Sequence, residues 1–203
     1  MKTLIEKLER IVAEYKEKFQ EPEDKKVQLS ELKPGDVFET SFGEMIVLEN
    51  LDGKATVITK GLVKESQRYD DESPNFAKSE ISEYLSNDVL EMFEKEFGAE
   101  NILEDFTDVF SVDVQKYDSY MGKVRLLTFD EARKYNELIV NEELPRWYWT
   151  MTPWSTKKRG WDYSVAVVSP SGNIGYYGCD VCVLGVRPVC ILKSNIFVSK
   201  KND

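Results

Sequence analysis

The sequence predicts an α+β domain preceded by an N-terminal amphipathic helix. Apolar residues recur at helical spacing over residues 1–20, and short apolar runs separated by turn residues begin at Leu32. The C-terminal part of the chain reads as short strands and irregular loops rich in Trp, Tyr, Gly and Ser. A chain of 203 residues suits one domain, so we expect a helix and linker over residues 1–26 and the domain over residues 27–203.

The first predicted element is the helix over residues 1–20. Its apolar stripe consists of Leu4, Leu8, Ile11, Tyr15 and Phe19. Pro22 and the charges around it predict a stop and a linker that reaches Lys26. Two alternatives stay open for this helix: it packs on its own domain, or it forms a short coiled-coil arm of a homo-oligomer. A helix of fewer than about three heptads is too short to assemble alone, so the second alternative needs contacts between the domains as well.

Strands and tight turns follow from Leu32. The run Lys33-Pro34-Gly35-Asp36 predicts a turn before a strand over residues 37–40. Two further strands, over residues 44–48 and 55–59, flank Asp52-Gly53, which is the strongest hairpin signal in the chain.

The middle of the chain predicts helices with one more strand between them. Two helices are expected between Lys78 and Phe106. Their apolar positions are Ile81, Leu85, Val89 and Phe93 in the first and Leu103 and Phe106 in the second. A strand is expected over residues 124–127. Thr128 then predicts the N-cap of a helix over residues 129–139, with Glu131 completing a capping box.

Charge and hydropathy exclude several classes of protein. The 27 basic and 37 acidic side chains leave a net charge of 27 − 37 = −10, which makes the protein a poor binder of nucleic acid. No apolar run approaches the roughly 18 residues of a membrane span, and the N-terminus has no secretory leader pattern. We therefore expect a soluble protein, either cytoplasmic or part of a phage particle.

The chain contains no histidine. This excludes catalytic triads and dyads that use histidine, as well as the common histidine-ligated zinc and iron sites. The three cysteines, Cys179, Cys182 and Cys190, leave a tetrahedral zinc site one ligand short. We expect reduced, structural thiols and no metal or cofactor, and a redox or metal role for the Cys179/Cys182 pair stays open.

Aromatic residues concentrate near the C-terminus. Strand alternation places Trp147 and Trp149 on one face, where we expect them in the core. Other aromatics lie among small polar and charged residues, a loop composition typical of paratopes and sugar sites: Trp154, Trp161, Tyr163, Tyr176 and Tyr177. The alternative is that these side chains cover a loop-rich flank of the domain. The acidic runs 70–72 and 104–108 read as solvated surface.

The Trp-rich segment ending in Thr152-Pro153, the Gly172-Asn173 turn and the terminal Gly185-Val186-Arg187-Pro188 resemble a known family. It is an uncharacterised bacterial and phage domain family with a C-type-lectin-like fold, akin to formylglycine-generating enzymes and to the variable proteins of diversity-generating retroelements. The strand over 44–48 with its hairpin, the run 75–81 leading to Tyr84-Leu85, and the run 123–128 match it as well. The resemblance covers roughly residues 32–192.

The resemblance implies a non-enzymatic binding platform of phage or prophage origin, an adhesin for a glycan or protein on a target surface. In diversified relatives the variable positions precede the closing Gly-x-Arg-Pro strand and form the ligand surface. Carried onto this chain, they are Trp154, Ser155, Trp161, Asp162, Tyr163, Tyr176, Tyr177, Cys179 and Asp180. Arg187 is expected to be structural, a buried guanidinium that ties loops to backbone carbonyls.

Two other functions stay open. The first is a phage structural or assembly protein without its own ligand, which uses residues 1–20 to oligomerise. The second is a copper-dependent cysteine oxidase of the formylglycine-generating type, for which Cys179 and Cys182 would have to meet across a turn. The sugar-binding motifs of calcium-dependent lectins are missing, and Trp161-Asp162 alone does not supply the six to eight oxygens of a calcium site.

Overall fold

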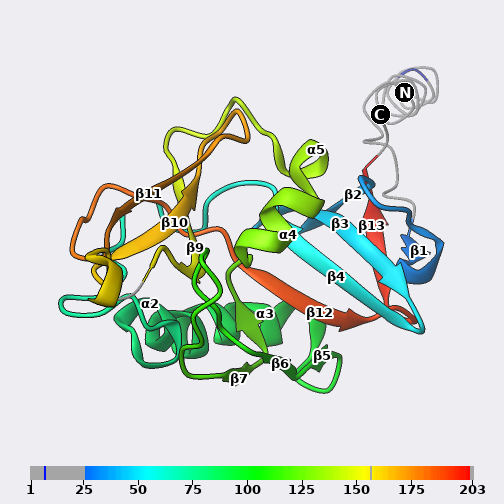
Figure 1. Cartoon of the computed structure of the whole chain (residues 1–203). Coiled ribbons are helices and arrows are strands. Elements are labelled where there is room, and N and C mark those ends of the chain that lie inside the picture. The colour runs from blue at the N-terminus through cyan, green and yellow to red at the C-terminus, as the bar shows by residue number, and fades with distance from the viewer. Residues whose placement is uncertain (1–6, 8–25, 156, 202–203) are drawn as a thin grey trace.

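The computed structural model describes residues 7, 26–155 and 157–201 of the chain. The helix expected over residues 1–20 lies outside the described residues, apart from Lys7. The described part is a mixed α+β structure in which strands predominate, and this confirms the predicted class (Figure 1). Among the described residues, no helix is both long and apolar enough to cross a membrane.

The strands form three antiparallel sheets. In the main sheet the order is β1 (Lys26–Gln28), β13 (Phe197–Lys200), β2 (Val37–Thr40), β3 (Gly43–Leu51), β4 (Lys54–Thr59), β12 (Val189–Lys193) and β5 (Ile102–Leu103), with β8 (Val124–Arg125) also paired to β12. A second sheet has the order β11 (Ile174–Gly178), β10 (Ser164–Val168) and β9 (Tyr148–Pro153). The third pairs β6 (Asp105–Thr107) with β7 (Tyr120–Gly122). Figure 1 shows the second sheet on the opposite side of the molecule from β1 and β13.

Both predicted turns are confirmed. Gly35 has φ of +93° and Asp36 donates its backbone N–H to the Lys33 carbonyl over 2.9 Å. In the β3–β4 hairpin, Asp52 and Gly53 have φ of 52° and 76°. Positive φ at both central residues is the requirement of the type I′ turn, which joins two twisted strands with two residues.

The first of the two helices expected between Lys78 and Phe106 is confirmed. It comprises α2 (Glu80–Tyr84), a π-helical turn over Leu85–Val89 and α3 (Leu90–Phe97), and it buries the four predicted apolar residues. The second helix is wrong. Leu103 lies in β5, paired with Ile191 of β12, and Phe106 lies in β6 with 65% of its surface exposed. A pair of apolar residues three apart fits a strand with a bend as well as a helix, and Gly98 ends α3 at φ of +81°.

The capping box is confirmed. Thr128 Oγ1 accepts the backbone N–H of Glu131 over 3.1 Å, and Glu131 Oε2 accepts that of Thr128 over 2.9 Å. The helix it begins is interrupted at Tyr135, which separates α4 (Phe129–Lys134) from α5 (Asn136–Ile139). The strand before it is shorter than expected, since only Val124 and Arg125 pair with β12.

The two faces of the main sheet bury two separate cores. Met45 and Val47 of β3 point into the larger core, whereas their neighbours Ile46 and Leu48 point into the smaller one. Because side chains alternate along a strand, one strand serves both cores. The smaller core is closed by α4 and α5, which lie over β3 and β4 in Figure 1.

Arg187 is a buried guanidinium that holds three segments together, as predicted. It is fully buried, and it donates Nε–H to the Thr59 carbonyl over 2.7 Å and Nη1–H to the Ile139 carbonyl over 2.6 Å. A further bond of 3.1 Å reaches the hydroxyl of Tyr148, whose ring lies under the guanidinium. The Arg187 side chain therefore holds together the end of β4, the end of α5 and the start of β9.

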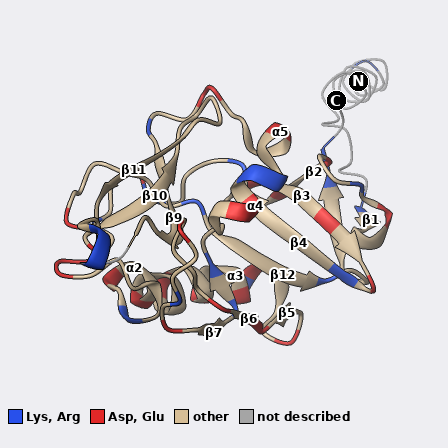
Figure 2. Cartoon of the chain, in the orientation of Figure 1, with Lys and Arg blue, Asp and Glu red and all other residues tan. Residues whose placement is uncertain are grey.

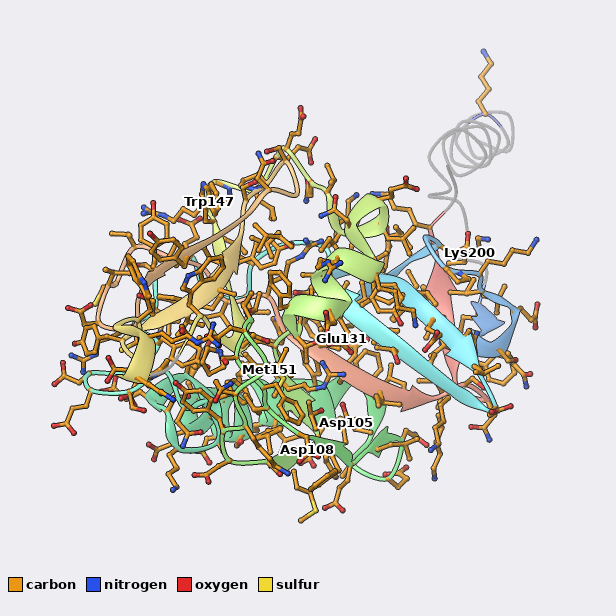
Figure 3. The ribbon with its side chains drawn as sticks, viewed as in Figure 1. Asp105, Asp108, Glu131, Trp147, Met151 and Lys200 are labelled. Atoms are coloured by element: carbon orange, nitrogen blue, oxygen red, sulfur yellow. The ribbon has the colours of Figure 1, made fainter. Side chains whose placement is uncertain are left out.

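The acidic runs are not solvated throughout. Arg125, which is buried, binds Glu131 through two bonds of 2.7 Å and also contacts the Asp105 carboxylate. Figure 3 labels Asp105 and Glu131, which come from β6 and α4. Asp70 accepts backbone N–H bonds from Glu72 and Ser73 within its own loop. Carboxylates in both runs therefore hold the chain in place, which net charge alone does not reveal.

Candidate functional site

The candidate site is built on β11, the outer strand of the second sheet. Residues 175–183 were expected to form a loop, and this is wrong for residues 175–178, which belong to β11 and pair with β10. Its glycines and tyrosines resemble loop composition, but Gly175 gives room to the Trp147 ring, which lies 3.1 Å from where a Cβ would stand. Tyr176 and Tyr177 are consecutive in a strand, so their side chains lie on opposite faces of the sheet.

Tyr176 joins two tryptophans on one face of β11, and we call these three residues the aromatic cluster. The Trp154 and Tyr176 rings are tilted by 30° with centroids 4.7 Å apart, and the Trp161 ring meets Tyr176 edge-on at 5.2 Å. Trp161 and Tyr176 are 47% and 43% exposed, while Trp154 is half-buried. Sequence-predicted residues from two segments thus meet in one surface feature.

The other face of β11 carries a smaller pair. Tyr177 is 42% exposed and meets the half-buried Trp147 edge-on, with centroids 6.4 Å apart. Figure 3 labels Trp147 on the side of the molecule that holds β9, β10 and β11. Trp149 is fully buried as expected and donates its indole N–H to the Gln67 carbonyl, but Trp147 is at the rim. Trp147 is a residue of this surface that sequence reasoning assigned to the core.

The backbone of loop 154–163 is held by hydrogen bonds to β10. Trp154 donates its backbone N–H to the Ser164 carbonyl over 2.7 Å, and Ser164 donates to the Trp161 carbonyl over 3.3 Å. Tyr163 donates its hydroxyl to the Asp71 carbonyl over 2.8 Å, so the 70–72 loop supports it. The aromatic cluster is therefore pre-organised by the sheet, not free on a long loop.

Two predicted site residues lie beneath the surface, which corrects the expectation for them. Ser155 is buried, and its hydroxyl donates to Asp113 Oδ2 over 2.8 Å. Cys179 is fully buried, and burial raises the pKa of its thiol to about 12. Its carbonyl accepts the backbone N–H groups of Tyr69 and Asp70. Neither side chain can contact a ligand at this surface without rearrangement.

The charged residues of the site have separate surroundings. Asp180 is exposed and its carboxylate lies beside Gly178, where a Cβ would stand 2.9 Å from Oδ1; Asp162 is half-buried. Figure 2 shows the basic segment Lys157–Arg159 (η4) at the same end of the molecule. Arg159 Nε lies 3.0 Å from Asp113 Oδ2, so its charge is paired. Asp180, in the turn that follows β11, is therefore an exposed acidic group next to this strand, and the exposed Lys158 lies in η4.

The three thiols do not form a disulfide. Cys182 is exposed, whereas Cys179 and Cys190 are buried. A turn centred on Cys179 and Asp180, in which Val181 donates to the Gly178 carbonyl over 3.3 Å, leaves one thiol inside and one outside. Within the described ranges, no cluster of three or more Cys, Asp or Glu side chains has the geometry to hold a metal ion.

One hollow of the surface, of about 300 Å³, has none of the site residues in its lining. It is lined by Phe110, Val114, Phe129, Asp130, Arg133 and Met151, among others. Val114 adopts φ of +64°, an uncommon conformation for a β-branched residue, and its side chain is exposed. The sequence holds no signal for this conformation, since a position with positive φ normally predicts Gly, Asn or Asp.

The features that distinguish the site are an outer strand with aromatic groups on both faces and acidic residues near one end. Its residues come from Trp147 just before β9, the 154–163 loop, β11 and the turn after it. Comparisons of the chain with protein-family models, with curated proteins and with solved structures find no match.

Proposed function

We propose that this protein is a non-enzymatic recognition protein that binds a ligand on a target surface through the aromatic cluster. The observation that carries the proposal is the packing of Trp154, Tyr176 and Trp161 into one partly exposed group. Large aromatic rings supply much contact area and lose little conformational entropy on binding, which is why they dominate paratopes and interface hot spots. A group already assembled in the free protein lowers the cost of binding further.

The proposal extends to family and origin. A C-type-lectin-like domain of phage or prophage origin, an adhesin for a glycan or protein, is supported by the motifs shared with that family. A further support is that positions far apart in its variable segment, Trp161 and Tyr176, contact each other here. Diversification of these positions by a retroelement is part of the same proposal.

The test compares binding of the intact protein to a glycan array and to bacterial cell surfaces with that of two variants. In the first variant, Trp161→Ala and Tyr176→Ala remove the exposed part of the aromatic cluster. We expect affinity to fall by about 30-fold or more, which is the loss typical of hot-spot aromatics.

The matched control is Phe197→Ala, which removes an exposed aromatic side chain from β13, outside the second sheet. A ligand held by the aromatic cluster keeps most of its affinity in this control. Equal losses in both variants, with circular dichroism showing both folded, would assign binding elsewhere. A folded wild-type protein that binds neither surface would leave the assembly role as the stronger reading.

A further inference from the structure

β11 has an open hydrogen-bonding edge. Cys179 donates its N–H to the Tyr163 carbonyl over 2.9 Å, and Ser169 donates its own to the Asn173 carbonyl over 2.8 Å. Between these pairs the antiparallel alternation directs the N–H and C=O groups of Gly175 and Tyr177 to β10. Those of Ile174 and Tyr176 point the other way, and no described residue bonds to them.

This edge lacks the features that normally keep an edge strand from pairing with another chain. The other open edge strands among the described residues are short: β1, β6 and β7 have three residues each, and β5 and β8 have two. β9, on the far side of the second sheet, is buried throughout and ends in Pro153. β11 has five residues, Ile-Gly-Tyr-Tyr-Gly, with no charge and no proline. Such an edge is a template for another strand.

Side chains on both faces flank the open edge. A strand added beside β11 would direct alternate side chains toward the aromatic cluster and toward the Tyr177–Trp147 pair. In strand addition the main-chain bonds supply affinity, and contacts to alternate side chains supply specificity. Both components are present here within one strand.

Charge favours a different protein over a second copy of this chain as the source of the added strand. The chain carries a net charge of −10, so a second copy would bring a like charge to this edge. Asp180 is exposed at the C-terminal end of β11, beside Gly178. A neutral or basic segment meets this end more favourably than the same acidic protein would.

We propose that the ligand is an extended polypeptide segment of neutral or basic character from another protein, which adds to β11 as an antiparallel or parallel fourth strand of the second sheet. The inference rests on the proposed recognition function and names its ligand class. The segment bonds to the backbone of Ile174 and Tyr176 and places its alternate side chains against the aromatic groups on the two faces.

The first experiment selects peptides from a displayed library of random sequences and measures amide hydrogen exchange of the full chain by NMR with the best peptide. In the free protein the amides of Ile174 and Tyr176 exchange fast, and those of Gly175 and Tyr177 exchange slowly. The bound peptide slows Ile174 and Tyr176 by at least about tenfold, as expected when an exposed amide gains a bond. A library that yields no peptide, or a peptide that leaves these two amides unchanged, overturns the proposal.

The second experiment uses Ile174→Pro, which removes one outward N–H without breaking a bond to β10. Proline is tolerated at the first residue of an edge strand, and the matched control Ile174→Ala keeps the N–H while it removes the side chain. Peptide affinity should fall about tenfold in the proline variant relative to the alanine variant. Equal affinities would overturn strand addition.

Three outcomes separate this inference from the proposed function. Binding of glycans that depends on Trp161 and Tyr176 but is equal in Ile174→Pro and Ile174→Ala overturns strand addition and leaves recognition standing. The absence of both glycan and peptide binding overturns both. Self-association that Ile174→Pro abolishes, measured by sedimentation of the full chain, identifies a second copy as the occupant and overturns the proposed partner.

Discussion

Arg187 holds its charge in the core through neutral partners. It bonds to two backbone carbonyls and one tyrosine hydroxyl, and within the described part of the chain it has no ion pair with a carboxylate. Its removal in Arg187→Met leaves the Thr59 and Ile139 carbonyls buried without donors. Each buried acceptor without a donor costs about 1–3 kcal/mol, so we expect the free energy of unfolding to fall by about 2–4 kcal/mol in urea titrations. A loss below about 0.5 kcal/mol would contradict the assigned role.

The thiols should differ sharply in reactivity. Burial raises the pKa of Cys179 to about 12, and burial raises the pKa of Cys190 as well, so both stay protonated and covered near neutral pH. Cys182 is exposed. At a pH of about 8 we expect a thiol-specific chromophore to modify one thiol per folded chain, and all three after unfolding in urea.

Cys182→Ser provides the control for that measurement. The folded variant should show no fast-reacting thiol, while Cys179→Ser should keep one. Fast modification of Cys179 in the folded chain would mean that the surface opens there, and it would restore this residue to the accessible site.

The burial of Ser155 and Cys179 shows why single residues of the site could not all be predicted. Trp154, beside Ser155, is half-buried, and Asp180, beside Cys179, is exposed. The groups that cover the two buried residues come from elsewhere: Asp113 accepts the Ser155 hydroxyl, and the backbone N–H groups of residues 69 and 70 bond to the Cys179 carbonyl. The exposure of Trp161 and Tyr176 was predictable because polar residues and glycines surround both in the sequence. Composition reports the local surroundings of a residue, whereas burial depends on long-range contacts.

Glu131 links α4 to β8 and β6, and its ionisation sets a pH dependence. Burial raises the pKa of this carboxyl, but the Arg125 guanidinium and the Thr128 bonds outweigh it and hold the pKa below 4.5. A lowered pKa in the folded state means that the unfolded chain binds the proton more tightly. The stabilisation is therefore complete above a pH of about 4.5 and is lost as the pH falls through the folded-state pKa.

Glu131→Gln tests this linkage. We expect the free energy of unfolding to fall by about 2 kcal/mol near neutral pH, because Arg125 loses a charged partner while Asp105 remains. The difference from wild type should shrink as the pH is lowered below about 4.5, where wild-type Glu131 takes up a proton. A difference that is constant from neutral to acid pH would show that packing, and not charge, is responsible.

The elements that sequence predicted are those fixed by local chemistry. Asp52-Gly53 meets the backbone requirement of its turn by itself, and Thr128 with Glu131 caps a helix within four residues. β5 depends on a partner that local patterns do not show, because it pairs with β12, almost 90 positions away (Ile191↔Leu103). β11 pairs with the neighbouring β10 across residues 169–173, but its glycines and tyrosines resemble loop composition. The sequence shows that residues 174–178 contain no charge and no proline, but it does not show that they form the outer strand of a sheet.

The whole chain combines a binding surface with an N-terminal segment outside the described residues. The surface around β11 offers one site per chain, and adhesion to a repetitive target surface gains strongly from linking several such sites. The apolar stripe of residues 1–20 predicts a helix that can supply this multivalency, and it is also what an assembly role requires. The proposed recognition role and the alternative assembly role thus belong to different parts of the chain and can be tested separately.

Deletion of residues 1–25 tests the second part without touching β1, which begins at Lys26. We expect the full chain to sediment as a defined oligomer and the truncated chain as a monomer with unchanged circular dichroism in the strand region. In the full-length control, Leu8→Glu and Ile11→Glu place charges on the predicted stripe and should give the same loss, because buried charges disrupt helix association.

The truncated monomer should keep the affinity of a single site for its ligand and lose avidity for cell surfaces by about 100-fold. A full chain that sediments as a monomer would favour the alternative in which the helix packs on its own domain.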